Sequence, residues 1–418
     1  MNCCDQPGLL PVDQAINQLL DAVAPITESE VVSVADALGR VLSEDVIALV
    51  DVPPANNSAM DGYVLRFADV RKAEPTDKGT AILPISQRIP AGKNPEPLEP
   101  GSAARIFTGA EIPLGADTVV MQEQCTSIND GEAVEFPVTV CLGDHIRPKG
   151  QDITSGSAIL KRGHKLQPQD LGLMASIGLA EVKVYRRLKL AVLSTGDEIV
   201  EPGTECGPGH IYNSNRYTLA GLIDAMGMER IDLGIVPDDA EATGEALRKA
   251  AVKADCIITT GGVSVGEEDH VKACVERLGE LQMWRLAIKP GKPLAFGRVL
   301  DTPFFGLPGN PGAVFVTFAI AARPYLLRYQ GVEGDVLPLP LRVKANFDRT
   351  KAAPRQEYLR ARLDVDEQGV IGASMHNNQS SGALSAASWG NGFAVQPINQ
   401  LIAAGDSVQF IPFSELFA

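Results

Sequence analysis

The sequence predicts a multidomain α/β plus β protein. Its centre should be a doubly wound, mainly parallel α/β domain, accompanied by a split helical N-terminal domain, an inserted β domain and a C-terminal β domain. The chain has 418 residues, 45% of them hydrophobic, which is enough for several cores. Strand-like and helix-like segments alternate from about residue 188 to 330, whereas short β-type runs fill two other regions.

The first domain is expected to be discontinuous. Residues 12–25 place apolar side chains on one helical face, and a shorter helical pattern follows at 34–38. Residues 152–186 return to a helix and a strand, so we expect 1–53 and 152–186 together to form a split N-terminal linker domain. Residues 54–151 contain short strands separated by Gly, Pro and Asn, which predicts an inserted β domain.

Residues 187–330 are predicted to form the α/β domain. The strand-like segments "KLAVLST", "RIDLGIV", "DCIITT", "MWRLAI" and "FFGLP" each end in turn residues, and helical patterns lie between most of them. Residues 331–418 are again β-like, with "PLPLRVKANF", "EYLRARLDV" and "SVQFIPF" between turns. They are expected to form the C-terminal domain.

The composition excludes several functions. The net charge of −15, with no basic run to offset it, argues against binding to nucleic acid or to an anionic membrane. The start of the sequence lacks the pattern of a signal peptide, and the most apolar stretch, 312–322, is too short to span a bilayer. We therefore expect a soluble cytoplasmic protein without nucleic-acid or membrane partners.

Cysteine and histidine usage narrows the choice of metal. Seven cysteines occur without a C-x-x-C pair, which suits reduced thiols in a cytoplasm. No H-E-x-x-H motif and no Cys/His cluster is present, so zinc is disfavoured. Any metal should be a hard cation held by carboxylates.

Chemically unusual residues collect where the predicted strands of the α/β domain end. The loops are "STGDE", "PDD", "TTGGVSVGEED", "KPGKP" and "LPGNP". In open α/β sheets, ligands bind at the carboxyl ends of the strands. A nucleotide P-loop would place Lys after its last glycine, but here Glu267, Glu268 and Asp269 follow Gly266. We therefore expect the glycine loop to bind phosphate through Mg²⁺, while lysines bind the anionic ligand directly.

Structural roles compete with these functional ones. The glycine loop alone would serve equally well as a tight strand-to-helix connection, and one of Asp238 and Asp239 is expected to cap a helix. A second candidate site lies in the first half of the chain, where "NNSAMDG", Thr108 and Asp152 occupy polar turns. These turns would provide a lid or the wall of a neighbouring subunit's site.

Several long motifs together resemble the molybdopterin molybdenumtransferase family of the MoeA type, which is related to the E domain of gephyrin. They are, in order, "NNSAMDGY", "IFTGAEIP", "GADTVVMQE", "STGDEI", "TTGGVSVGEEDHV", "AIKPGKP" and "GLPGNP". The resemblance implies a homodimer of elongated four-domain subunits. It also implies an α/β domain like that of the molybdopterin adenylyltransferase MogA, and a C-terminal β-barrel.

The implied activity is insertion of molybdenum from molybdate into adenylylated molybdopterin, with Mg²⁺-dependent hydrolysis that releases AMP and molybdenum cofactor. The resemblance implies catalytic roles for Asp61, Glu198 and Asp269, and Mg²⁺ binding by Glu198, Asp238 and Asp269. Asp61 and Thr108 would come from the partner subunit. The molybdopterin adenylyltransferase and acceptor molybdoenzymes are further implied partners. The implied substrate-binding residues are Thr108, Asp152, Gly261, Gly262, Ser264, Arg285, Lys289, Lys292, Pro308, Pro311, Arg360 and Ser381.

Three segments depart from the family pattern. Arg285 stands where Lys is usual, Gly312-Ala313 stands where Val-Ser is usual, and "NQSS" replaces Gln-Gly-Ser. Two alternatives to molybdenum insertion therefore stay open: a tungsten-inserting paralogue, and a non-catalytic scaffold like gephyrin.

Overall fold

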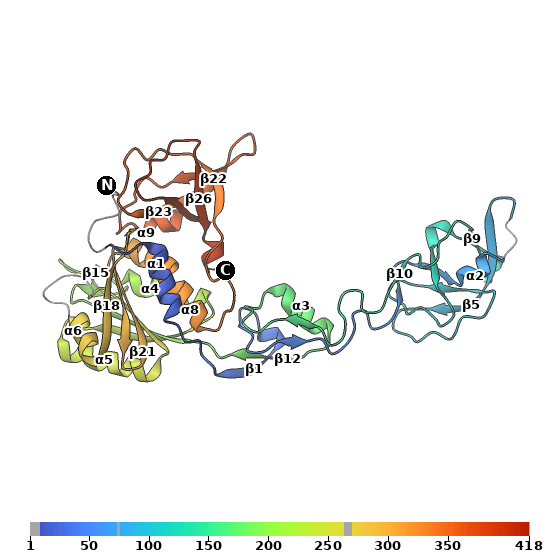
Figure 1. Ribbon diagram of the computed structural model, residues 1–418, viewed down its shortest axis with the longest axis horizontal. Coiled ribbons are helices and arrows are strands. Elements are labelled where there is room, and N and C mark those ends of the chain that lie inside the picture. Colours follow the sequence, from blue (N-terminus) through green and yellow to red (C-terminus); the bar gives the residue numbers. More distant parts are fainter. Residues whose placement is uncertain (1–8, 73–75, 263–269, 418) are drawn as a thin grey trace.

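The computed structural model describes residues 9–72, 76–262 and 270–417. The molecule is elongated (Figure 1), with the α/β domain and a C-terminal β domain at one end and the inserted β domain at the other. A small domain built around β1, β12 and α3 lies between them. The multidomain α/β plus β fold class predicted from the sequence is confirmed.

The small middle domain is assembled from both sides of the insertion. Strand β1 (Ser29–Ser33) pairs antiparallel with β12 (Glu181–Tyr185), and β2 (Val46–Ile47) pairs with β11 (Ala158–Leu160). The 3₁₀-helix η1 (Val34–Asp36) packs on α3 (Pro168–Ser176), and apolar residues of both segments share one core.

Helix α1 (Val12–Asp21) does not join that middle domain, which corrects the expected grouping of residues 12–25 with it. Its apolar face, formed by Val12, Ala15, Ile16 and Leu19, is buried in the core of the α/β domain. It packs against α8 (Arg323–Tyr329) and the π-helical turn η4 (Phe318–Ala322). The sequence pattern shows that a face will be buried but not which core receives it.

The inserted domain holds a six-stranded sheet in the order β7-β4-β6-β5-β9-β8. A short helix, α2 (Phe67–Val70), follows β4, and a two-stranded ribbon of β3 (Asn57–Ser58) and β10 (Ile146–Arg147) adjoins the sheet. The strands are β4 (Gly62–Leu65), β5 (Thr80–Ile89), β6 (Ala103–Ile106), β7 (Thr118–Met121), β8 (Thr126–Ile128) and β9 (Ala133–Pro137).

The α/β domain contains a six-stranded sheet in the order β16-β13-β17-β21-β20-β18. The strands are β13 (Lys189–Thr195), β16 (Glu229–Val236), β17 (Cys256–Thr260), β18 (Gly279–Arg285), β20 (Pro293–Val299) and β21 (Thr302–Leu307). The helices are α4 (Ser214–Ala225), α5 (Ala240–Lys253), α6 (His270–Leu278) and α7 (Pro311–Thr317), the last continuing through η4 into α8. A two-stranded parallel ribbon, β14 (Ile199–Val200) and β15 (Ile211–Tyr212), follows β13.

Strand direction places the loops of interest at one edge of this sheet. In this sheet β20 runs opposite to the other five strands, which all point the same way. The loops that follow β16, β13, β17, β21 and β18 therefore begin at a common edge, in that order. Since ligands bind at such an edge in open α/β sheets, the order of these loops sets the layout of the site.

The C-terminal domain is a closed barrel. Around the barrel the strands follow the order β23-β24-β22-β26-β25, and β25 pairs with β23 to close it. Their bounds are β22 (Leu341–Ala345), β23 (Gln356–Val365), β24 (Ile371–Met375), β25 (Gly392–Gln396) and β26 (Ser407–Pro412). Helix α9 (Leu384–Trp389) and helix α10 (Ser414–Phe417) complete the domain.

Two features join the barrel to the α/β domain. Strand β19 (Ile288–Lys289), in the loop after β18, pairs with β23 of the barrel. Phe315 of α7 packs among the barrel aromatics, with ring centroids 5.8 Å from Phe393, 5.2 Å from Phe413 and 5.3 Å from Phe417. The two domains are therefore held together at two places, by the strand pairing of β19 with β23 and by the packing of α7 on the barrel.

Candidate functional site

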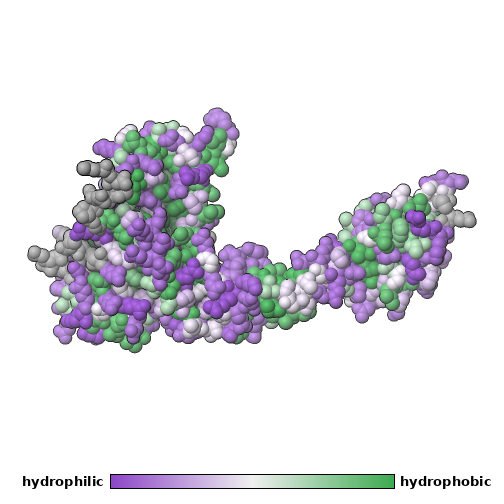
Figure 2. Space-filling view, viewed as in Figure 1, coloured by the Kyte–Doolittle hydropathy of each residue, from purple (hydrophilic) through white to green (hydrophobic). Residues whose placement is uncertain are grey.

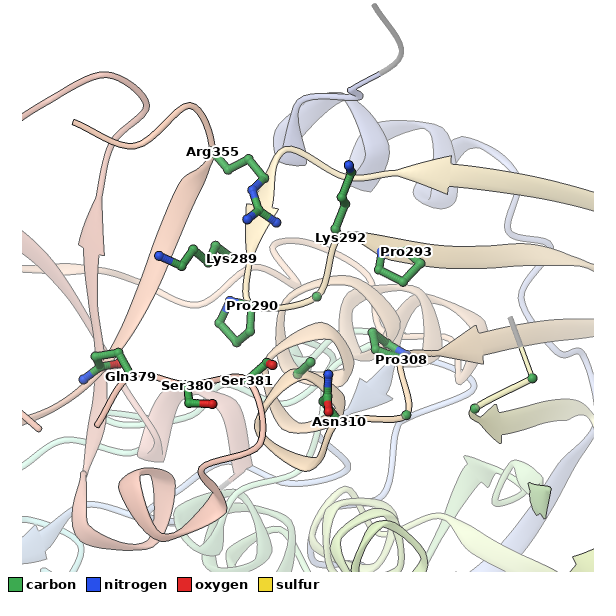
Figure 3. A pocket seen from close by; sticks show the side chains of 15 residues that line it. Lys289, Pro290, Lys292, Pro293, Pro308, Asn310, Arg355, Gln379, Ser380 and Ser381 are labelled. Carbon is green, nitrogen blue, oxygen red and sulfur yellow. The ribbon is translucent and has the colours of Figure 1, made fainter. Parts of the chain in front are cut away.

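A cavity of about 490 Å³ lies between the carboxyl edge of the α/β sheet and a loop of the barrel (Figure 3). Three sheet loops and two barrel segments, one before β23 and one after β24, line it. Its lining residues are Gly261, Gly262, Lys289, Pro290, Gly291, Lys292, Pro293, Pro308, Gly309, Asn310, Ala313, Arg355, Gln379, Ser380 and Ser381. The cavity thus brings together Gly261, Gly262, Lys289, Lys292, Pro308 and Ser381 from the residues expected at the site.

Close packing behind the cavity fixes the lysine loop. Gly291 has φ 109°, in the left-handed region that favours glycine. A Cβ at this position would lie 2.2 Å from Thr317 Cγ2 of α7. Because glycine has no side chain, the backbone of the loop can approach α7 this closely. The turn then holds Lys289 on one side and Lys292 on the other.

Three cationic side chains line the cavity. Lys289 donates from Nζ to Glu357 Oε1 at 2.7 Å, and Arg355 donates from Nη1 to the carbonyl of Ile288 at 3.2 Å. Lys292 is exposed, and Figure 3 shows it extending away from Lys289. This cationic wall, in a chain of net charge −15, suits an anionic ligand.

The barrel loop at the cavity is held from behind by Arg360 of β23. Arg360 is 1% exposed and donates from Nη2 to the carbonyl of Ser380 at 3.0 Å, while its backbone N–H donates to Gln379 Oε1. Burial lowers the pKa of the Arg360 guanidinium to about 10, and the charge of Glu357 partly offsets that effect. Arg360 does not line the cavity itself but positions the loop that does.

Two of the departures from the family pattern lie in contact. A Cβ on Gly312 would already be 2.8 Å from the carbonyl oxygen of Ser381, and the backbone N–H of Ala313 donates to that oxygen at 3.1 Å. The glycine therefore allows the "NQSS" loop to approach the start of α7. Pro311, also expected at the site, is the first residue of α7.

The acidic loops lie at the other end of the same sheet edge. Glu198 and Asp238 are exposed, and the loops that carry them touch where Asp238 N–H donates to Asp197 Oδ1 at 3.1 Å. Asp239 caps α5 by accepting from the N–H groups of Glu241 and Ala242, so Asp238 is the residue of the pair left for ligand contact.

Exposed carboxylates of this kind fit Mg²⁺, which is held by few carboxylates and otherwise by water and phosphate oxygens. Within the described ranges, no group of three or more His, Cys, Asp or Glu side chains that could hold a metal is found. Asp269 and Ser264 lie outside the described residues, so the three-carboxylate set expected from the sequence remains a prediction.

Four residues expected at the site lie away from the cavity in this chain. Asp61 and Thr108 belong to the inserted domain at the far end of the molecule, and Asp152 lies where the chain returns from that domain (Figure 1). Arg285 ends β18 and is exposed, and only its strand partner Pro293 lines the cavity.

Asp61 and Thr108 nevertheless form one unit. Asp61 Oδ1 accepts from both the backbone N–H and the hydroxyl of Thr108, each at 2.7 Å. These two hydrogen bonds, the one from the backbone N–H having the larger effect, hold the pKa of Asp61 below its usual value. The carboxylate is therefore kept ionised on the surface of the inserted domain.

Sequence reasoning missed Arg355, Glu357 and Gln379, all of which come from the barrel domain. It also missed Asn215 of α4, which donates from Nδ2 to the carbonyl of Gly309 at 2.7 Å. The available signal was the charged run "PRQEYLR", in which Arg355 directly precedes β23 and Glu357 lies near its start.

Three family descriptions match consecutive parts of the chain. Residues 10–178 match the MoeA N-terminal region (domain I and II), 191–328 match the probable molybdopterin binding domain, and 342–413 match the MoeA C-terminal region (domain IV). No helix in the described part of the chain combines the length and the apolar character needed to cross a membrane.

Relatives match over nearly the whole length. The molybdopterin molybdenumtransferase of Haemophilus influenzae is 39% identical over 411 residues, covering 98% of this chain and 100% of the relative. That of Nostoc sp. is 35% identical and covers 96% and 93%. The crystal structure of the molybdopterin biosynthesis moeA protein from Pyrococcus horikoshii OT3 is similar with a TM-score of 0.82 at 28% identity, covering 97% of this chain and 100% of that one.

A molybdopterin-binding α/β domain, flanked by matched N-terminal and barrel domains, defines an enzyme of molybdenum cofactor biosynthesis. The chain belongs to the molybdopterin molybdenumtransferase family, so the resemblance seen in the sequence motifs is confirmed.

Proposed function

We propose that this protein inserts molybdenum from molybdate into adenylylated molybdopterin, with Mg²⁺-dependent hydrolysis of the phosphoanhydride and release of AMP and molybdenum cofactor. The observation that carries this proposal is the order of chemistry along the sheet edge. Carboxylates follow β16 and β13, glycines follow β17, and lysines follow β18 at the other end.

This order suits a reaction that needs carboxylates at one end of the sheet edge to hold a metal ion and lysines at the other end to hold an anion. At the acidic end, Glu198, Asp238 and Asp269 would hold Mg²⁺, which would neutralise charge on the phosphoanhydride while water breaks its P–O bond. At the lysine end, Lys289 and Lys292 would hold the molybdate dianion beside the molybdopterin sulfurs. Ser381 and the backbone around Gly261, Gly262 and Pro308 would complete the wall of the cavity.

A homodimer explains the position of Asp61 and Thr108. Both lie far from the cavity of their own chain, so they would contribute to the site of a second copy. The middle domain exposes large apolar side chains that a partner would cover, and Figure 2 shows hydrophobic residues gathered on the visible face of this domain. The exposed residues include Val31, Leu38, Ile47, Leu49 and Val50.

The remaining parts of the proposal follow from this reaction. The protein would act in the cytoplasm, receive its substrate from the molybdopterin adenylyltransferase and deliver the product to acceptor molybdoenzymes. A scaffold role is less favoured, because a scaffold needs neither the lysine loop nor exposed carboxylates at the same edge.

The proposal predicts that purified protein releases AMP from adenylylated molybdopterin when Mg²⁺ and molybdate are both present. Omitting Mg²⁺ should reduce release to background, because the phosphoanhydride charge is then unscreened. AMP is measured by chromatography, with tungstate replacing molybdate in a parallel reaction. Faster release with tungstate would favour the tungsten-inserting alternative, and no release with either oxyanion would reject the enzymatic proposal.

Mixed dimers test whether two subunits share each site. Asp61→Ala subunits and Lys292→Met subunits should each be inactive alone, but a heterodimer would keep one cleft with both residues intact. Random mixing should then restore about one quarter of wild-type AMP release. Heterodimers that are isolated by two affinity tags and remain inactive would show that the site is confined to one subunit.

A further inference from the structure

The most unusual charged group near the cavity is the carboxylate of Glu357 in β23. Its side chain is only 4% exposed, yet it has two cationic partners. Oε1 accepts from Lys289 Nζ at 2.7 Å, and Oε2 accepts from Arg349 Nη2. A buried carboxylate is costly unless it is paired, so this arrangement needs both cations.

The far side of Glu357 is fixed by a chain of hydrogen bonds. Arg349 donates from Nε to Gln396 Oε1 at 2.8 Å. Gln396 is fully buried, and its Nε2 donates to the carbonyls of Lys351 and Gln400 at 3.1 and 2.8 Å. The carboxylate therefore has little freedom to move, because its fixed partner is anchored to the barrel backbone.

On the side of the cavity, the partner of Glu357 is Lys289, whose side chain is 44% exposed and lines the cavity. Lys289 and Arg355 also line a second cavity of about 440 Å³ on the barrel side. Figure 3 shows the Lys289 side chain extending toward the barrel strand. An ammonium group has three N–H donors, so one bond to Glu357 leaves two for a ligand.

We infer that Glu357 is a positioning residue, which tethers the ammonium of Lys289 at the junction of the two cavities so that its remaining N–H groups meet a tetrahedral oxyanion. The ligand class, a dianion such as molybdate, rests on the proposed function. Glu357 and Lys289 are also directly opposed in the β19–β23 ladder, so backbone and side chains fix the same pair.

Loss of this carboxylate has two opposite effects on anion binding, one through charge and one through the position of Lys289. Removing a negative charge beside the site would by itself tighten anion binding. Glu357→Gln, however, offers one acceptor oxygen to two cationic donors, so its amide NH₂ would face either Lys289 or Arg349. Lys289 would then be released into the wider space of the two cavities. If position dominates, the variant should bind the oxyanion more weakly.

The test is calorimetric titration of the full-length protein with sodium molybdate. We expect Glu357→Gln to raise the Kd about tenfold, and Glu357→Asp, which keeps the charge, to stay within about threefold of wild type. Asp364→Asn is the matched control, because Asp364 lies on the same strand and pairs with Arg362 in an exposed ion pair. It should leave the Kd unchanged.

A double-mutant cycle shows whether the effect passes through Lys289. In the Lys289→Met background, adding Glu357→Gln should weaken molybdate binding no further. Additive effects, tighter binding by Glu357→Gln, or a lowered unfolding temperature with an unchanged Kd would each overturn the inference. So would a wild-type protein that binds no molybdate. AMP release is measured separately, and its absence alongside the expected binding pattern would reject only the proposed function.

Discussion

The Gly291→Ala variant is expected to release AMP about a hundredfold more slowly than the wild-type protein. The new Cβ would lie 2.2 Å from Thr317 Cγ2, and alanine would have to adopt a φ of 109°. The loop must therefore move, and Lys289 and Lys292 would move with it. Strain and overpacking together should lower the free energy of unfolding by about 2–4 kcal/mol. AMP release is measured on folded protein at a temperature well below the unfolding transition.

Gly234→Ala separates the backbone strain from the clash. Gly234 also has a positive φ, 74°, but a Cβ there would meet no atom within 4 Å. This variant should lose about 1–2 kcal/mol of stability and keep normal AMP release. If both variants released AMP at the wild-type rate, the position of the lysine loop would not limit the reaction.

Phe393→Ala is expected to lower the free energy of unfolding by about 3–5 kcal/mol. Phe393 of β25 is fully buried and packs against Phe315, Tyr358 and Phe413, with ring centroids 5.8, 6.1 and 5.0 Å away. The substitution would leave a cavity in the seam between α7 and the barrel, which the fixed strands on either side cannot fill. Chemical denaturation measures the change.

Val252→Ala provides the control for this prediction. Val252 lies on α5 and is 81% exposed, so its truncation should change stability by less than about 0.5 kcal/mol. A loss below about 1 kcal/mol for Phe393→Ala would mean that the aromatic cluster contributes little to joining the barrel and the α/β domain.

The sheet edge could be predicted from the sequence because its signals are local. The central strands β13, β17 and β21 are short, mostly apolar runs, and the residues after them are glycines, prolines or charges that a buried strand excludes. The topology of such sheets then brings these loops together. For the same reason, a helix cap at one of Asp238 and Asp239 could be expected from the sequence, and the structure assigns it to Asp239.

Contacts between domains could not be predicted in this way. Helix α1 has a clear apolar face, but its pattern does not distinguish the middle domain from the α/β core that buries it. The pairing of Lys289 with Glu357 joins residues 68 positions apart across two domains, and nothing in either segment indicates the other. Arg360 carries the same lesson, since its sequence context suggested ligand contact whereas its burial makes it a support for the Ser380 loop.

Strand β19 assigns two neighbouring lysines to different domains. Lys289 lies in β19, which pairs with β23 of the barrel. Lys292 directly precedes β20, so its position is set by the α/β sheet. The distance between the two ammonium groups is therefore set by how the barrel is seated on the α/β domain, and Gly291, packed against α7, fixes the turn that joins them. Selectivity for a dianion of a given size would thus be built into the fit between two domains and not into either domain alone.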